Sequence, residues 1–200
     1  MLLDNVSEKN LLIYNGLSNR EMGTIKSNYL ISYEFKASNL RSFVNWRDRN
    51  LSVINNIKEL LQQKSFDNTA LILVDDFVGT GETIEKAFYD ISMRLKVHGK
   101  VIRKFVVLSI VAMQQAVDRL SRSGIEVFCS HKIGRGISDF YEGDSLKIAK
   151  RLMTEIEKKL KVSEAFKFGY KQSEALVCME RCPNNTFALF RAGRNAIFRR

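Results

Sequence analysis

Short apolar runs alternate with amphipathic stretches along most of this chain. An apolar run bounded by polar turns is typical of a buried strand, whereas apolar residues at i, i+3, i+4 and i+7 indicate a helix. The runs predict strands at residues 29–35, 51–54, 69–74, 101–111, 125–131, 175–179 and 186–190. The helical spacing predicts helices at residues 40–50, 55–63, 84–95, 113–120 and 146–160.

This order of strands and helices predicts an α/β fold, with a central, mostly parallel sheet flanked by helices. In such folds the loops at the carboxyl ends of the strands form the ligand site. Two hundred residues suffice for one domain of this kind with a substantial core. We expect that domain at residues 29–190, after a segment, 1–28, that the pattern does not define, and before a basic tail at 191–200.

The stretch LILVDDFVGTGETI, residues 71–84, contains the strongest candidate for chemistry. A buried run ends in Asp75 and Asp76, and a turn with Gly79 and Gly81 follows before a helical pattern begins. Backbone N–H groups of such a loop and a helix N-terminus can hold a phosphate. Ionised carboxylates accept hydrogen bonds from sugar hydroxyls. The stretch therefore suits a sugar phosphate.

Two other phosphate motifs do not fit this stretch. A Walker A loop needs Gly-Lys-Ser/Thr, but Glu82 and Thr83 follow Gly81. A dinucleotide-binding turn has its glycines directly after the strand and its acid further on, which is the reverse of the order here. An ordinary strand-to-helix turn with a threonine cap is the alternative that stays open.

These residues also carry a family resemblance. Residues 74–83, VDDFVGTGET, resemble the PRPP-binding motif of type I phosphoribosyltransferases, and the version DDFVGTG resembles the PRTase-CE branch of bacterial conflict systems, found with retrons and other anti-phage modules. A second block, CPNNT at residues 182–186 followed by apolar residues 187–190, resembles the C-terminal signature of that branch. The resemblance extends over about residues 28–190.

The resemblance implies a single-domain type I phosphoribosyltransferase-like fold with a small C-terminal hood. It implies that Asp75 and Asp76 are catalytic residues that hold the ribose hydroxyls, and that they meet Mg²⁺ only indirectly, through those hydroxyls or water. Mg²⁺ would be recruited with PRPP. Asp76 as a general base is an alternative role. The residues expected to cradle the 5′-phosphate are Val78, Gly79, Thr80, Gly81, Glu82 and Thr83.

Further ligand contacts follow from the same resemblance. The pyrophosphate is expected beside Lys36, Ser38 and Arg41, in the turn after the first predicted strand, where an ordinary polar turn is the alternative. Lys132 and Asp139 are expected near the base or acceptor, where a glycine-rich surface loop is the alternative. The CPNNT block is read either as a hood element beside the nucleotide or as a structural corner.

One departure from the catalytic pattern leaves two functions open. Many nucleotide-synthesising relatives close a long flexible loop over PRPP, and the segment between residues 54 and 69 contains a short helical pattern instead. The first function is an enzyme, a PRPP-dependent (phospho)ribosyltransferase of the pentosyl glycosyltransferase class, acting as an effector or accessory component in anti-phage defence. The second is a catalytically inactive nucleotide-sensing or nucleoprotein-docking module of a retron-type system.

The charge of the chain points to a further partner. Thirty-two basic and twenty-two acidic residues give a net charge of +10, more than one small substrate requires. Such an excess suits a nucleic-acid or ribonucleoprotein partner held through phosphates. Basic clusters at residues 147–151, 158–161 and 191–200 are candidates, and a solvated helix face is the alternative for each.

Composition excludes several other classes. A hydrophobic fraction of 45% argues against a disordered chain, and no apolar run approaches the roughly 20 residues of a membrane span. Residues 1–16 lack the basic flank of a signal peptide. Cys129, Cys178 and Cys182 lack metal-site spacing, so we expect reduced packing thiols in a cytoplasmic protein, with a homodimer possible.

Overall fold

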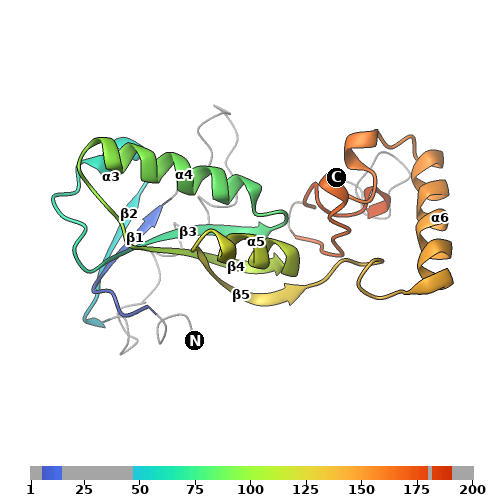
Figure 1. The fold of residues 1–200 in the computed structure, drawn as a ribbon, viewed down its shortest axis with the longest axis horizontal. Helices are drawn as coiled ribbons and strands as arrows, with labels where there is room; N and C mark the ends of the chain where they lie inside the picture. Colours follow the sequence, from blue (N-terminus) through green and yellow to red (C-terminus); the bar gives the residue numbers. More distant parts are fainter. Residues whose placement is uncertain (1–5, 15–46, 180–181, 191–200) are drawn as a thin grey trace. The chain divides into compact units, whose positions relative to one another are not determined.

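The computed structural model describes residues 6–14, 47–179 and 182–190 (Figure 1). The strand predicted at 29–35 and most of the helix predicted at 40–50 lie outside these residues. Lys36, Ser38 and Arg41 lie outside them as well.

The described residues form an α/β fold around one five-stranded sheet with the strand order β2-β1-β3-β4-β5. Strand β1 pairs in parallel with β2 on one side and with β3 on the other. Strands β3, β4 and β5 point in the same direction (Figure 1). The strands are β1 (Asn10–Tyr14), β2 (Asn50–Ile54), β3 (Thr69–Val78), β4 (Lys104–Met113) and β5 (Glu126–Ile133).

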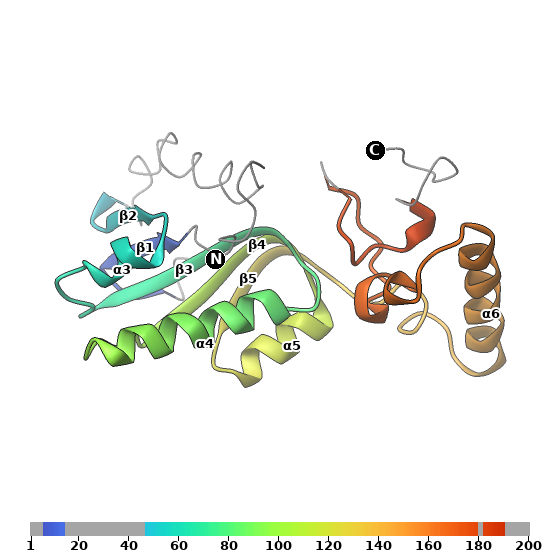
Figure 2. The same ribbon diagram turned by 90° about the horizontal axis from the view of Figure 1, so that it is seen from above.

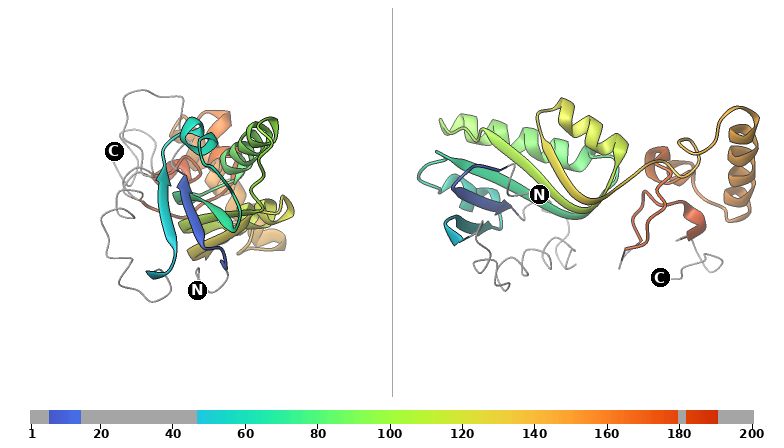
Figure 3. Two further views of the ribbon diagram at one scale, coloured as in Figure 1. Left: turned by 90° about the vertical axis from the view of Figure 1, so that its left-hand side faces the viewer. Right: turned by 90° about the horizontal axis from the view of Figure 1, so that it is seen from below.

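Three helices accompany the sheet in the described chain: α3 (Ile57–Leu61), α4 (Glu82–Val97) and α5 (Gln114–Arg122). Helices α4 and α5 lie on the same face of the sheet (Figures 2 and 3). Alternate residues of neighbouring strands form one core, with Leu11, Ile13, Ile72, Val74 and Val106 all at most 1% exposed. The period of two places these side chains on one face.

The other face of β3 is buried too, which explains its continuous apolar run. Leu71 and Leu73 are fully buried, and α4 buries Ile84, Ile91 and Leu95. A strand buried on both faces has no polar alternation. The sequence pattern therefore located this central strand correctly.

By its contacts the chain divides into two compact units. The first comprises Met1–Asp76, Gly81–Ile110 and Val117–Ser130, and the second comprises Phe77–Thr80, Val111–Ala116 and His131–Arg200. In the second unit, α6 (Gly143–Lys159) is followed by short 3₁₀ turns at Glu164–Phe166, Tyr170–Gln172 and Ala188–Phe190.

The structure corrects several predicted elements. Strand β1 lies within the segment that the pattern left undefined, and Asn50, expected to end a helix, opens β2. Strand β3 continues past Val74 to Val78, so both acids lie inside the strand. Strands and helices predicted near residues 51–54, 55–63, 101–111, 113–120, 125–131 and 146–160 are confirmed, with shifted ends.

The two strands predicted at the C-terminus are wrong. Residues 175–179 and 186–190 make one isolated bridge, between Ala175 and Thr186, and then a 3₁₀ turn. Positive φ angles at Gly169, Lys171 and Glu174 bend the chain before the first predicted strand. This left-handed backbone is incompatible with an extended ladder.

Helix α6 has the predicted length but not a buried apolar face. Among its residues, all of which are described, only Glu157 is buried, while Ile148 is 68% and Leu152 is 61% exposed. None of the three cysteines, each a described residue, forms a disulfide; Cys182 is buried and Cys178 is exposed, so packing does not explain Cys178. No helix in the described part of the chain has the length and hydrophobicity needed to cross a membrane.

Candidate functional site

The two acids occupy the carboxyl-terminal part of β3. Asp75 and Asp76 are each half-buried and take successive strand positions, so their Cβ atoms leave the backbone on opposite faces of the sheet. The Asp76 N–H donates to Asp75 Oδ1 at 3.0 Å, and Ser109 Oγ of β4 donates to the Asp76 carbonyl at 3.3 Å. The neighbouring strand therefore fixes the backbone at Asp76.

Helix α4 begins at Gly81, which has a left-handed backbone with φ 73° and ψ −6°. A residue with a Cβ is strained in this conformation. The Glu85 N–H donates to the Gly81 carbonyl at 2.9 Å, and no side chain caps the helix. The threonine cap expected for an ordinary turn is therefore absent. The first N–H groups of any helix lack partners within it, so this N-terminus can receive an anion.

Two glutamates lie in the first turn of α4, and both are paired with cations. Glu82 pairs with Lys86 at 3.0 Å. Glu85 accepts from Ser123 Oγ at 2.7 Å and pairs with Arg119 at 2.6 Å. The hydrogen bond from Ser123 and then that from Arg119 lower the pKa of Glu85. Because both carboxylates have compensating partners, their repulsion of a phosphate at the helix N-terminus is reduced.

Gly79, in the turn between β3 and α4, lies in direct contact with Asn185 of the CPNNT block. A Cβ on residue 79 would lie 2.3 Å from Asn185 Cγ and Oδ1 and 2.4 Å from Nδ2. Such distances are far shorter than van der Waals contact, so a Cβ at residue 79 would fit only if the Asn185 side chain moved. The two blocks that carried the family resemblance therefore meet within the second unit.

The backbone of Asn185 is held from several sides. Its carbonyl accepts from the Ala175 N–H at 3.1 Å and lies 2.9 Å from Ser173 Oγ. Gly169, with φ 78°, lies so close that a Cβ there would be 2.0 Å from the Asn185 carbonyl oxygen. Ser173 is fully buried. These contacts are those of a structural corner, while a hood element beside a nucleotide stays a prediction.

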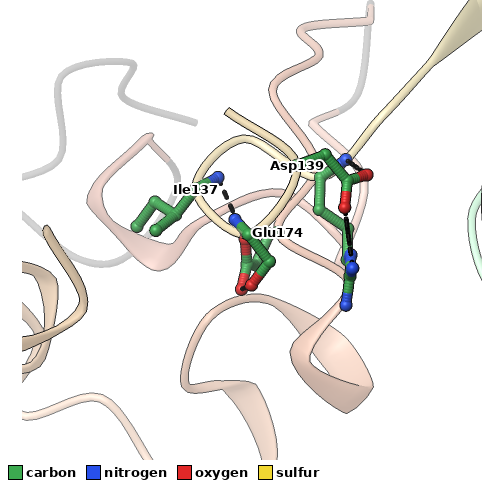
Figure 4. A network of polar contacts seen from close by, with 5 residues as sticks. Ile137, Asp139 and Glu174 are labelled. Atoms are coloured by element: carbon green, nitrogen blue, oxygen red, sulfur yellow. Dashed lines mark hydrogen bonds and ion pairs between the residues drawn. The ribbon is translucent and has the colours of Figure 1, made fainter. Parts of the chain in front are cut away.

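The two residues expected near a base or acceptor have separate surroundings. Lys132 is exposed on β5. The Asp139 carboxylate accepts from the Arg135 backbone N–H at 2.7 Å and from Arg135 Nε at 2.8 Å (Figure 4). The Arg135 side chain, followed by its backbone N–H, lowers the pKa of Asp139. Asp139 thus holds the turn after β5, and contact with a base stays a prediction for both residues.

Sequence reasoning missed one buried carboxylate in this region. Glu174 is 3% exposed, and its Oε2 accepts from the N–H groups of Ile137 and Ser138 at 3.0 and 2.6 Å (Figure 4). Its Oε1 accepts from Ser138 Oγ at 2.6 Å. A lone glutamate near apolar residues gives no sequence signal of this role, because its partners are backbone groups.

The described residues contain no group of three or more His, Cys, Asp or Glu side chains arranged to hold a metal. The candidate donors at the site are Asp75 and Asp76. Mg²⁺ is commonly held by one or two carboxylates together with substrate phosphates and water. Because the two carboxylates leave β3 on opposite faces, they do not form one direct donor set, and they fit a magnesium ion that arrives with a phosphorylated ligand and is reached through that ligand or water.

Comparison with known proteins identifies relatives of the chain. The profile of the family PRTase-CE matches residues 6–200, which includes most of the segment 1–28 that the pattern left undefined. No curated protein sequence matches. Among solved structures, orotate phosphoribosyltransferase from Aeropyrum pernix matches with 13% identity and a TM-score of 0.33, over 64% of this chain and 62% of that chain. The AQ2163 protein from Aquifex aeolicus matches with 15% identity and a TM-score of 0.35, over 64% and 57%. The chain thus covers less than two thirds of either structure.

Proposed function

The chain belongs to the PRTase-CE family, and we propose that it binds PRPP or a related ribose phosphate, together with Mg²⁺, at the segment from Asp75 to Thr83. The observation that carries the proposal is the order of groups in this segment. Two half-buried acids are followed by a turn in which Gly79 and Gly81 lack side chains, and then by a helix with no side-chain cap. This order offers acceptors for hydroxyls and donors for a phosphate.

The residues have distinct roles in this proposal. Asp75 and Asp76 accept hydrogen bonds from ribose hydroxyls, and backbone N–H groups of the turn and of the first turn of α4 donate to the 5′-phosphate. Thr80 and Thr83 supply further hydroxyl donors. Asp75 and Asp76 would hold Mg²⁺ only indirectly, through the ribose hydroxyls or water, and the ion would supply positive charge that offsets the charge of the pyrophosphate.

The favoured activity is transfer of a ribose phosphate to a nitrogen nucleophile. The bond between C1 of the ribose and the pyrophosphate oxygen breaks, a bond from C1 to nitrogen forms, and the nucleophile's proton passes to water or to Asp76. Positive charge develops on the ribose ring, so the carboxylates beside the hydroxyls stabilise the transition state. We place this activity in an anti-phage module, on the basis of the family resemblance.

Binding of PRPP is the first test. Isothermal titration calorimetry with PRPP and Mg²⁺ should give a Kd below the millimolar range, and the variant Asp75→Asn/Asp76→Asn should bind at least about a hundredfold more weakly, since two charge-assisted hydrogen bonds are weakened. The matched control is Asp90→Asn, an exposed acid on α4 that pairs with Arg94. A wild-type protein that gives no heat at millimolar PRPP would overturn the proposal.

The alternative function is a module that binds the ligand without converting it. Release of pyrophosphate, assayed over bases, nucleosides and nucleic acids, separates the two. Turnover that is lost in Asp75→Asn/Asp76→Asn supports the enzyme. Binding of PRPP with no pyrophosphate release over any acceptor supports the sensor.

A nucleic-acid partner is favoured by one specific observation on α6. Lys147, Lys150, Arg151 and Lys158 are all exposed and recur at i, i+3, i+4 and i+11, which places them on one stripe of the helix. Lys147 also pairs with the exposed Asp144 at 2.9 Å. A row of exposed cations can follow a phosphate backbone. We propose this stripe as the docking surface for nucleic acid.

A further inference from the structure

The side chain of Asn185 meets the turn at Gly79 with the flat face of its amide. The three atoms Cγ, Oδ1 and Nδ2 lie at nearly equal distances, 2.3, 2.3 and 2.4 Å, from the place that a Cβ on residue 79 would occupy. Equal distances to all three atoms mean that this point lies above the plane of the amide. The N–H and C=O groups of the amide therefore lie parallel to the contact and are not directed into Gly79.

The contacts of Ser173 fix which way the amide is turned. Ser173 Oγ lies 2.8 Å from the Tyr170 carbonyl and 2.9 Å from the Asn185 carbonyl, so its single proton is used by one of these acceptors. Ser173 Oγ can then only accept from the Asn185 side chain, and Nδ2 lies 3.2 Å away. One N–H of Nδ2 donates to Ser173, and the other N–H remains in the plane of the amide.

A polar side chain with this placement is suited to a ligand on the turn. An apolar side chain at residue 185 could make the contact with Gly79 equally well, so the contact does not explain why residue 185 carries an amide. The backbone of Asn185 is already held by Ala175 and Gly169. The side chain is half-buried, so part of it reaches solvent. The Asn185 amide lies against Gly79 of this turn, and both residues belong to the same compact unit.

We infer that Asn185 is a ligand-contacting residue, and that its second Nδ2–H donates to the phosphate ester held by the turn at Gly79. The inference rests on the proposed function, since it adds a side-chain donor to that phosphate site. The ligand class is a sugar phosphate monoester. The CPNNT block then has a binding role as well as a structural one.

The test uses ribose 5-phosphate in calorimetric titrations of the whole chain. Asn185→Ala should weaken binding about tenfold through loss of one hydrogen bond to a charged group. Asn185→Asp keeps the shape but replaces the donor by a charge of the same sign as the phosphate, so it should weaken binding about a hundredfold. The exposed neighbour supplies the control, because Asn184→Ala should change the Kd less than about twofold.

A second measurement separates contact from positioning. Binding of ribose, which has no phosphate, is followed by saturation-transfer NMR at millimolar sugar, and Asn185→Ala should leave it unchanged. An equal loss for ribose and ribose 5-phosphate would overturn the contact, as would equal affinities of Asn185→Ala and Asn185→Asp. If Asn185→Asp does not fold, the comparison of ribose with ribose 5-phosphate in Asn185→Ala still decides whether Asn185 contacts the phosphate. A wild-type chain that binds neither PRPP nor ribose 5-phosphate would overturn the proposed function and this inference together.

Discussion

Asn185 lies with its side-chain amide on the Cα of Gly79, and a Cβ at residue 79 would be 2.3 Å from Asn185 Cγ. The contact joins the turn after β3 to the corner built around Ser173 and Gly169. Gly79 does not have the positive φ that favours glycine elsewhere in the chain, such as at Gly81 and Gly169. The restriction on residue 79 therefore comes from the neighbouring side chain and not from the backbone conformation.

This relationship predicts a compensating pair of substitutions. Gly79→Ala should lower the free energy of unfolding by about 1–3 kcal/mol, because the added methyl group overlaps the amide. Adding Asn185→Ala should restore part of that loss, so the double variant should be more stable than the sum of the single changes. Urea unfolding of the four proteins measures the coupling.

The control for this cycle is Gly124→Ala. Gly124 has φ 76° and no neighbour within 4 Å of an added Cβ, so its cost is backbone strain. That cost should be the same whether or not the chain also carries Asn185→Ala. A strictly additive result for the Gly79 pair would mean that the contact with Asn185 does not restrict residue 79.

The buried carboxylate of Glu174 predicts a large effect from a small change. Its two oxygens accept from two backbone N–H groups and one hydroxyl of Ile137 and Ser138. In Glu174→Gln a neutral amide oxygen replaces the charged acceptor of the two backbone N–H groups, while the NH₂ group can donate to Ser138 Oγ, which also accepts. The expected loss, from weaker hydrogen bonds to a neutral acceptor, is about 1–2 kcal/mol in the free energy of unfolding, measured with urea.

A matched control exists on the surface of the same unit. Glu164 pairs with Lys167, and its side chain is 85% exposed. Glu164→Gln should change stability by less than about 0.5 kcal/mol, because exposed ion pairs contribute little. If the two glutamine variants unfolded at the same urea concentration, the hydrogen bonds around Glu174 would not stabilise the fold more than an exposed ion pair does.

The central part of the fold could be predicted from the sequence because its signals are local. The run before Asp75 is buried on both faces, and α4 shows its apolar spacing, so strand, turn and helix follow from neighbouring residues. Strand β1 was missed because it has only five residues, and their polar and apolar side chains do not alternate in the way that marks a strand. The extension of β3 through Asp76 depends on pairing with a strand that is distant in the sequence. The apolar pattern of neighbouring residues does not reveal such pairing.

The C-terminal region shows where local patterns fail. Apolar residues near 175–179 and 186–190 suggested strands, but the chain is organised by contacts of single polar groups. Thr186 Oγ1 donates to the Val177 carbonyl at 2.9 Å, and Ser173 and Asn185 bond each other. The meeting of Gly79 and Asn185 likewise links residues far apart in the sequence. Each block could be recognised alone, but not their contact.

Glu85 predicts a pH dependence of stability. Ser123 and Arg119 hold its pKa below the ordinary glutamate value of about 4.3. A carboxyl whose pKa is lowered by folding stabilises the protein above its unfolded pKa, and this contribution is lost as the pH falls through the folded value. Wild type should therefore be more stable than Glu85→Gln near pH 7, by at most about 1 kcal/mol because Arg119 is 40% exposed.

The measurement is thermal unfolding of both proteins from pH 7 to pH 2.5. The difference between them should shrink below about pH 4 as Glu85 becomes protonated. Glu82→Gln is the control, since Lys86 in that pair is 75% exposed and the pair should add little. A difference between wild type and Glu85→Gln that stays constant over the whole range would exclude the pairing of an ionised Glu85 as its source.

The basic stripe on α6 makes a prediction about salt. Lys150→Gln/Arg151→Gln removes two exposed cations, and if both contact phosphates of nucleic acid, the slope of log K against log salt should fall in magnitude by about two. Lys58→Gln/Lys96→Gln is the matched control, because it removes the same charge from exposed positions on α3 and α4. Fluorescence anisotropy with a labelled duplex measures both slopes between roughly 50 and 300 mM salt, a range in which counterion release dominates the salt dependence. Equal slopes for the two variants would show that only the net charge of the chain matters, and would remove α6 as the docking surface.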